Sequence, residues 1–266
     1  MTGTTKTDKI LTRSEGGITW LTFNQPEKRN AMSLEMTVRA LEVVEEFAAD
    51  PAARVLVLLG AGDKAFVSGA DISEFESKRN SAEAAAEYQK ISTRMFDAVR
   101  DVEKPTIAMI QGFCFGGGVA LAACCDIRIA SEDSLFSVPA AKLGIGYRIE
   151  FTKLLVDLVG PSSTKEMLYT ARRYTAEEAL AMRFVNRVVP KDQLESMTRN
   201  YAEGIAENAP LTQKAAKVIV NELLKDATAR DPLRCNRLIA ECADSEDYKN
   251  ARRAFMEKKK PVFAGR

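Results

Sequence analysis

Short apolar runs alternate with longer stretches of helical periodicity over the first 110 residues of the chain. Residues 18–23, 55–59 and 106–111 are rich in β-branched and large apolar side chains, which predicts three strands. Between the first two runs, Ser33 can cap a helix that extends to about Ala49. Apolar residues recur at helical spacing on one side of this helix: Met36, Ala40, Val43, Val44 and Phe47.

A second helix is expected over residues 81–102, because Lys104-Pro105 disfavours helix and leads into the third strand. Alternating strands and helices are typical of an α/β fold with a parallel sheet. From residue 162 onward the pattern is mainly helical, with helices predicted at 163–169, 175–182, 193–208 and 211–224, and one or two more at 231–255. We therefore expect a core over residues 1–195 and a C-terminal helical region over residues 196–266.

Composition limits the possible partners and location of the protein. No run approaches the roughly 18 consecutive apolar residues that a membrane span needs, so we expect no membrane partner. The polar segment 1–9 lacks the apolar stretch of a secretory signal, so a cytoplasmic location is expected. The formal net charge is +1, so the chain lacks the overall positive field typical of nucleic-acid-binding proteins.

The sequence contains no histidine, which excludes Ser-His-Asp triads, Cys-His dyads and His-ligated metals. Five cysteines are present, none at the spacing of a zinc or redox pair, and we expect buried free thiols: Cys114, Cys124, Cys125, Cys235 and Cys242. We therefore predict no metal and no separate cofactor. The chemistry is left to carboxylates, tyrosine, backbone amides and water.

Two glycine-containing segments each follow a predicted strand and precede a predicted helix. The first is residues 65–72, AFVSGADI, and the second is residues 111–119, QGFCFGGGV. Glycine lets the backbone approach a ligand closely, and free amides at a helix N-terminus favour an anionic oxygen. Each segment alone also fits a tight turn or close helix packing. Neither has the spacing of a nucleotide-binding fingerprint.

The paired motifs FVSGADI and GFCFGGG resemble those of the enoyl-CoA hydratase/isomerase, or crotonase, superfamily. The segments NQPEKRNAM, CCDIRIAS and AFMEKKKPVF are similar to further family motifs in the same order, so the resemblance covers nearly the whole chain. It implies a crotonase-like (ClpP/crotonase) spiral of ββα units with a C-terminal helical trimerisation region. It also implies an acyl-CoA substrate, with coenzyme A entering as part of that substrate, and a homotrimer or homohexamer.

The resemblance assigns the two amides of an oxyanion hole to Ala70 and Gly117. Two backbone donors would grip one thioester oxygen, where negative charge develops in an enolate. The resemblance also implies a set of residues that contact coenzyme A: Lys28, Arg29, Asn30, Ala31, Ala70, Asp71, Ile72, Phe255 and Lys258. Phe255 and Lys258 resemble positions that sometimes act from a neighbouring subunit, although Lys258 also fits a solvated helix terminus.

The chain departs from the family pattern at two positions. Family hydratases use two glutamates to add water, and Ala120 and Ala140 stand at those positions here. A methyl group cannot transfer a proton, and a general acid or base typically contributes roughly 10²- to 10⁴-fold to the rate. Glu150 is the carboxylate best placed by sequence to substitute for these glutamates; some isomerases of the family carry a working carboxylate two positions earlier, where this chain has Arg148. Glu150 also fits a surface ion pair with Arg148 or Lys153.

Tyr147 is similar to a tyrosine in family decarboxylases of the methylmalonyl-CoA type, although it also fits a residue packed under a loop. Arg148 could pair with a substrate carboxylate. Three hypotheses follow: a hydratase/isomerase homologue in which Glu150 or Tyr147 handles protons, a malonyl-type acyl-CoA decarboxylase, and a catalytically inactive protein that binds CoA thioesters.

Overall fold

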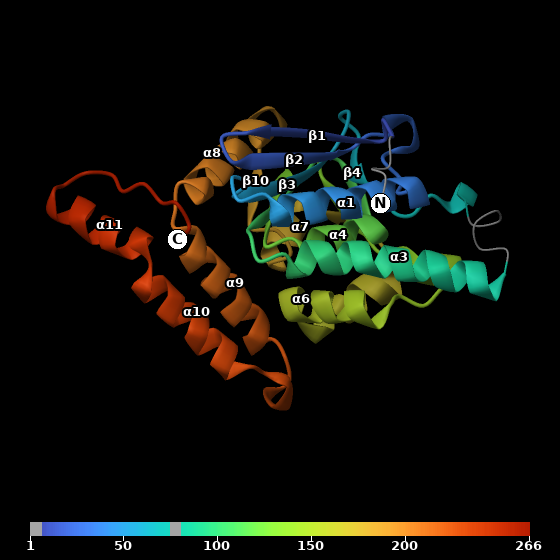
Figure 1. Ribbon diagram of the computed structural model, residues 1–266. Helices are drawn as coiled ribbons and strands as arrows, with labels where there is room; N and C mark the ends of the chain where they lie inside the picture. Colours follow the sequence, from blue (N-terminus) through green and yellow to red (C-terminus); the bar gives the residue numbers. More distant parts are fainter. Residues whose placement is uncertain (1–6, 75–80) are drawn as a thin grey trace.

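The computed structural model describes residues 7–74 and 81–266; residues 1–6, the start of the polar N-terminal segment, and residues 75–80 lie outside the described part. Two sheets form the centre of the molecule (Figure 1). The larger sheet has the order β1 (Ile10–Glu15), β2 (Ile18–Phe23), β3 (Val55–Gly60), β5 (Thr106–Ile110), β7 (Ile127–Ser131) and β10 (Arg187–Val189). The smaller sheet has the order β4 (Ala65–Val67), β6 (Phe113–Phe115), β8 (Leu135–Ser137) and β9 (Tyr174–Thr175).

The chain repeats a unit of two strands and a helix. β1 and β2 of the first unit both join the larger sheet. In the units that begin at β3, β5 and β7, the first strand joins the larger sheet, the second joins the smaller sheet, and a helix leads to the next unit. The helices of the core are α1 (Leu34–Ala49), α3 (Ala82–Asp101), α4 (Gly117–Cys124), α5 (Ala140–Leu143), α6 (Ile149–Thr170), α7 (Ala176–Ala181) and α8 (Leu194–Ala206), with short 3₁₀ turns at η1 (Pro26–Lys28), η2 (Ile72–Glu74) and η3 (Lys191–Gln193). Because β3, β5 and β7 are parallel neighbours, the units stack as a spiral.

The first helix begins at the cap that the sequence predicted, and the second begins after a serine cap at the start of its predicted range. Ser33 accepts a hydrogen bond from the Met36 amide at 3.2 Å, and Ser81 accepts one from the Ala84 amide at 3.1 Å. Each bond satisfies an amide that has no partner inside the helix. The apolar side of α1 that the spacing predicted is buried, so this prediction is confirmed.

Parallel strands of the larger sheet are buried on both faces, which explains their nearly continuous apolar sequence. Leu56 and Leu58 of β3 point into the large core with α1, α3, α4 and α6. Val55 and Val57 of the same strand point to the other face, where α8 covers the sheet. One strand therefore fixes two layers of helices at once.

Two features differ from the sequence-based expectations. The helix predicted at 163–169 is present as the part of α6 that follows a non-helical break at Gly160, where φ is 77°. The helical part from Ile149 up to this break was not predicted. The expected boundary at residue 195 falls inside α8, which packs on the larger sheet through Leu194 and Ala202.

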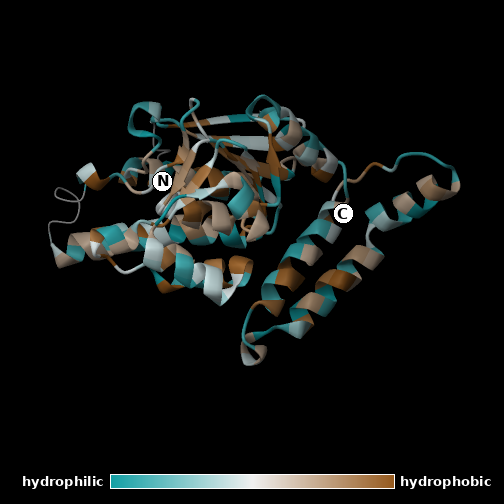
Figure 2. Ribbon diagram, turned by 180° about the vertical axis from the view of Figure 1, so that it is seen from behind, coloured by the Kyte–Doolittle hydropathy of each residue, from teal (hydrophilic) through white to brown (hydrophobic). Residues whose placement is uncertain are grey.

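The remaining helices form an arm that projects from the core (Figures 1 and 2). The arm consists of α9 (Pro210–Leu223), the 3₁₀ turn η4 (Ala227–Ala229), α10 (Pro232–Asp244) and α11 (Glu246–Met256). Its own buried cluster is small and centres on Ala215, Val218 and Leu238. Among the described residues, no helix has the length and apolar character needed to cross a bilayer.

Candidate active site

The two glycine segments lie next to each other because the strands that precede them are paired. β4 and β6 are parallel neighbours in the smaller sheet. Ala70 follows the end of β4, and Gly117 follows the end of β6 as the first residue of α4. Since the carboxyl ends of parallel neighbours meet at one edge of a sheet, successive turns of the spiral bring the two loops together.

The Ala70 amide is turned toward this edge by a backbone bridge. Met32 donates its amide to the Gly69 carbonyl at 2.8 Å and accepts from the Asp71 amide at 2.8 Å. These two bonds use the peptide groups on either side of Ala70 and leave its own N–H on the opposite side of the strand. Within residues 7–74 and 81–266, neither the Ala70 N–H nor the Gly117 N–H donates a hydrogen bond to a protein group.

The two amide nitrogens are close in space. A Cβ built on Gly117 would lie 3.7 Å from the Ala70 nitrogen, and a Cβ built on Gly69 would lie 3.8 Å from the Gly117 nitrogen. This keeps the Ala70 and Gly117 nitrogens within about 6 Å, the span that one oxygen accepting from both requires. Gly69 has φ 116°, a backbone conformation that residues other than glycine rarely adopt.

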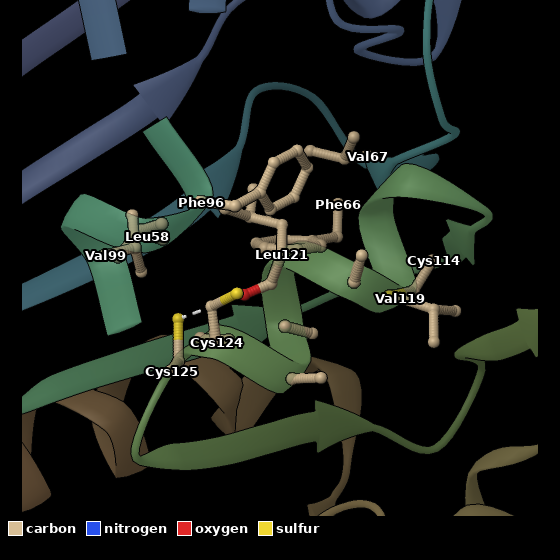
Figure 3. Packing of buried hydrophobic residues seen from close by; sticks show 14 of the residues in the cluster. Leu58, Phe66, Val67, Phe96, Val99, Cys114, Val119, Leu121, Cys124 and Cys125 are labelled. Atoms are coloured by element: carbon tan, nitrogen blue, oxygen red, sulfur yellow. Dashed lines mark hydrogen bonds between the residues drawn. The ribbon is translucent and has the colours of Figure 1, made fainter. Parts of the chain in front are cut away.

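Helix α4 is fixed firmly in the core. A Cβ built on Gly118 would lie 2.0 Å from the Val67 carbonyl oxygen, so only glycine permits this contact between α4 and β4. Leu121 lies next to Phe66 and Phe96, and Val119 lies beside Cys114, all within the large core (Figure 3). The dashed line in Figure 3 marks the 3.6 Å contact from the Cys125 thiol to the Leu121 carbonyl.

Arg128 holds the C-terminal end of α4, a contact that the sequence analysis did not anticipate. Its buried guanidinium donates to the carbonyls of Ala122, Cys125 and Phe184. A cation at a helix C-terminus satisfies carbonyls that lack an intrahelical partner and complements the helix dipole. A basic residue shortly after the helix was the sequence signal for this contact. The direction of the Arg128 side chain, however, depends on the position of β7, to which it belongs.

A cation and a carboxylate meet beside the Ala70 loop. Lys28 donates to the Asp71 carboxylate at 2.7 Å and to the Ser73 hydroxyl at 3.2 Å. The Ser73 amide and hydroxyl also donate to Asp71, at 3.0 and 2.6 Å. Burial raises the pKa of Asp71, but the hydrogen bonds from Lys28 and Ser73 outweigh it and hold this pKa below its usual value. Asp71 therefore stays ionised and fixes the position of the Lys28 ammonium.

The other residues of the Lys28 loop have different roles. Asn30 is fully buried, and its side chain donates to the carbonyls of Ala61 and Ala65. Its side chain therefore anchors the loop from inside the protein. Arg29 is exposed, with its guanidinium carbon 4.9 Å from the centre of the Phe113 ring, and Ala31 is partly exposed. Ile72 is exposed at the start of η2.

Tyr147 and Glu150 make different contacts, although only three positions separate them in the sequence. The Tyr147 hydroxyl donates to the Gly116 carbonyl at 3.2 Å, which places it at the start of α4. Glu150 is exposed and pairs with Arg148 at 3.4 Å. It lines a cleft of ≈ 1130 Å³ with Cys124, at the opposite end of α4 from Gly117. The structure therefore brings Tyr147 close to the paired amides. The described contacts of Glu150 lie near the other end of α4.

Arg148 is held from three sides. Its guanidinium donates to the Thr93 hydroxyl of α3 at 2.6 Å, pairs with Glu150, and lies 4.6 Å from the centre of the Phe151 ring. These contacts occupy the guanidinium group that a substrate carboxylate would need.

Burial raises the pKa of the Tyr147 phenol, so this side chain remains a neutral hydroxyl.

Comparison with known proteins gives the family. Residues 13–266 match the family model described as enoyl-CoA hydratase/isomerase. The chain belongs to the enoyl-CoA hydratase/isomerase family. It is 34% identical over 253 residues to the short-chain-enoyl-CoA hydratase of Clostridium acetobutylicum, covering 95% of this chain and 96% of that protein. It is 33% identical over 256 residues to the crotonyl-CoA hydratase of Syntrophomonas wolfei, covering 96% of this chain and 98% of that protein.

A solved structure confirms the fold. The crystal structure of an enoyl-CoA hydratase/carnithine racemase from Magnetospirillum magneticum has a TM-score of 0.91 to this chain, at 36% identity, and the match covers 98% of this chain and 97% of that one. The spiral of two-strand-and-helix units is therefore the crotonase fold that the motifs led us to expect. This chain is an acyl-CoA enzyme of the hydratase/isomerase family.

The chain carries alanine at the two positions for which the resemblance implies a glutamate in family hydratases. Ala120, one turn into α4, and Ala140, at the start of α5, are both buried methyl groups. Neither can hold a water molecule or carry a proton. Among the described residues, no cluster of carboxylates and thiols has the geometry of a metal site.

The C-terminal residues expected to contact coenzyme A lie away from the two glycine loops. Phe255 is 81% exposed on α11, and Lys258 follows it. Figures 1 and 2 both place α11 at the far end of the arm, away from β4 and the loop after it. All five cysteines are free thiols; Cys114, Cys124 and Cys125 are buried as expected, whereas Cys235 and Cys242 are only partly buried.

Proposed function

We propose that the protein binds an acyl-CoA thioester and stabilises its enolate through the Ala70 and Gly117 amides. The observation that carries the proposal is the pair of unbonded N–H groups, from two loops, with nitrogens close enough to share one oxygen. Such donors act where negative charge develops, and the loss of one typically costs roughly 10²- to 10³-fold in rate. The hydratase names of the relatives support an acyl-CoA substrate.

The Lys28 loop provides a place for the nucleotide end of coenzyme A. Lys28 is a half-exposed cation whose position is fixed by Asp71, and Arg29 is a second exposed cation on the same loop. We propose that these groups face the phosphates, while the backbone from Ala70 to Ile72 and the small side chain of Ala31 lie against the adenine. Fixed cations bind phosphate at a lower entropic cost than mobile ones.

The reaction itself is proposed from the groups that are present. Ala120 and Ala140 supply no general acid or base, and Tyr147 remains protonated. Under the first hypothesis, a hydratase or isomerase reaction, Glu150 would have to exchange its contact with Arg148 for one with the substrate. Decarboxylation of a malonyl-type thioester is the second candidate, because loss of carbon dioxide forms the enolate without proton abstraction.

We also propose that the protein is a trimer or a dimer of trimers. Figure 1 shows α11, which carries Phe255 and is followed by Lys258, far from β4 and the loop after it, so these two residues would contact coenzyme A only in a neighbouring subunit. The exposed apolar side chains Leu233, Phe255 and Met256 of the arm support this assembly. Sedimentation equilibrium of the wild-type protein and of Phe255→Ser measures the oligomeric state. A wild-type monomer at micromolar concentration would contradict the proposed trimer.

Binding is tested first, by calorimetry with acetoacetyl-CoA, free coenzyme A and acetoacetyl-pantetheine. We expect acetoacetyl-CoA to bind most tightly. Lys28→Met should weaken both coenzyme A ligands and leave the pantetheine thioester unchanged, whereas Lys90→Met on the exposed surface of α3 is the matched control. Absence of binding at saturating acetoacetyl-CoA would contradict the proposed function.

The reaction is then identified by mass spectrometry. The protein is incubated separately with crotonyl-CoA and methylmalonyl-CoA, and the products are compared with those of a heat-denatured sample. A gain of water on crotonyl-CoA supports hydration, and a loss of carbon dioxide from methylmalonyl-CoA supports decarboxylation. Binding without any product would support the inactive thioester-binding homologue. Glu150→Gln completes the test, because unchanged turnover removes that carboxylate from the mechanism.

A further inference from the structure

The Tyr147 hydroxyl donates to the carbonyl of the peptide group that carries the Gly117 N–H. Gly116 contributes the C=O of this group and Gly117 contributes its N–H, so the 3.2 Å hydrogen bond is made to the opposite end of the same planar unit. In a trans peptide the C=O and N–H point in opposite directions. A donor that fixes the carbonyl therefore also fixes the direction of the amide.

We propose that Tyr147 is a positioning residue that orients and polarises the Gly117 amide through the Gly116 carbonyl, without touching the substrate. The inference rests on the proposed function, because it assigns a purpose to the hydroxyl only if the Gly117 amide holds a thioester oxygen. It also separates Tyr147 from the proton-transfer and carboxylate-orienting roles that the sequence suggested.

The Tyr147 hydroxyl adds a side-chain donor to the backbone hydrogen bonds that hold this glycine turn. Gly116 has φ 52° and ψ −109°, and the two adjacent glycines leave the peptide between them unusually free to rotate. The Gly116 N–H donates to the Ser137 carbonyl at 2.8 Å, and its carbonyl also accepts from the Ala120 amide at 3.2 Å. The Tyr147 hydroxyl is the one side-chain donor that the described residues supply to this carbonyl.

Polarisation adds to orientation. A hydrogen bond accepted by a peptide carbonyl draws electron density toward the oxygen and makes the N–H of the same group a stronger donor, an effect estimated at about 10–30% per bond. The tyrosine ring is itself fixed, because it packs against the large core and lies 5.8 Å from the Phe151 ring. Its elevated pKa keeps the phenol protonated and therefore able to donate.

The test uses Tyr147→Phe, which removes the hydroxyl and keeps the ring. Butyryl-CoA labelled with ¹³C at the thioester carbonyl is bound to the protein, and its carbonyl stretch is measured by infrared difference spectroscopy. We expect a shift to lower frequency on the wild-type protein and a smaller shift on Tyr147→Phe. With a thioester that is turned over, kcat should fall about three- to tenfold while KM stays unchanged, as expected for one neutral hydrogen bond.

Two further variants separate this role from a general effect on the fold. Tyr201→Phe removes a hydroxyl that accepts from Arg187 on the other face of the larger sheet, and it should leave the carbonyl shift unchanged. Placing 3,5-difluorotyrosine at position 147 makes the phenol a stronger donor and should enlarge the shift. This second substitution keeps the test decisive if Tyr147→Phe does not fold.

Each outcome has a distinct meaning. A carbonyl shift of wild-type size in Tyr147→Phe overturns the inference and leaves the proposed function intact. Loss of all turnover with an unchanged carbonyl shift also overturns it, because Tyr147 would then act on the substrate directly. If butyryl-CoA binds to the wild-type protein without any carbonyl shift, the proposed oxyanion hole itself fails, and the inference fails with it.

Discussion

Replacement of Gly117 by alanine should separate folding from function. A methyl group at this position would lie 3.7 Å from the Ala70 nitrogen, the other proposed donor. Its closest neighbour, at 3.0 Å, is the Met32 methyl, the end of a flexible side chain that can move by a few tenths of an ångström. Gly117 also has a backbone conformation that alanine adopts readily.

The expected magnitudes differ sharply for stability and activity. The free energy of unfolding should change by less than about 1 kcal/mol, because the contact with Met32 is offset by the higher helix propensity of alanine. If the methyl excludes the oxygen from one donor, turnover should fall by roughly 10²- to 10³-fold, equivalent to about 3 to 4 kcal/mol of transition-state stabilisation.

Gly204→Ala is the matched control. Gly204 lies in α8, and a Cβ built on it meets no atom within 4 Å. This variant should raise the melting temperature by about 2 °C through helix propensity alone and leave turnover unchanged. Scanning calorimetry and steady-state kinetics on both variants give the comparison. A folded Gly117→Ala protein with full turnover would refute the assignment of this amide to the oxygen.

Three further predictions concern the surroundings of the site. Gly118→Ala should destabilise the protein by about 3 kcal/mol or more in urea unfolding, because its methyl would meet the Val67 carbonyl at 2.0 Å and separate α4 from β4. Arg128→Met should cost about 3 kcal/mol in the same assay, since it leaves buried carbonyls at the end of α4 without a donor. Asp71 has a lowered folded-state pKa, so its stabilising effect is present above its unfolded pKa of about 3.9 and lost as the pH falls through the folded value. The melting temperatures of wild type and Asp71→Asn should therefore differ at pH 7 and converge toward pH 3; a constant difference would contradict this.

The sequence alone determined the features that depend on local chemistry. Helices α1 and α3 start at Ser33 and Ser81, because a side-chain oxygen that caps free amides acts over three residues. The buried strands were visible because both faces of a parallel sheet require apolar residues. The order of the motifs around Gly69 and Gly117 indicated the family, since each motif is contiguous in the chain.

The family resemblance led us to expect Ala70 beside Gly117, but the physical cause of this pairing, and the place of the other candidate residues, are set by the tertiary structure. Ala70 and Gly117 meet because β4 pairs with β6, and no local signal in two strands of three residues gives that pairing. Tyr147 and Glu150 are three positions apart in sequence, yet one contacts Gly116 and the other faces a cleft at the far end of α4. The physical reason is that side-chain direction depends on where a helix begins and on what packs against it, and both are set by distant parts of the chain.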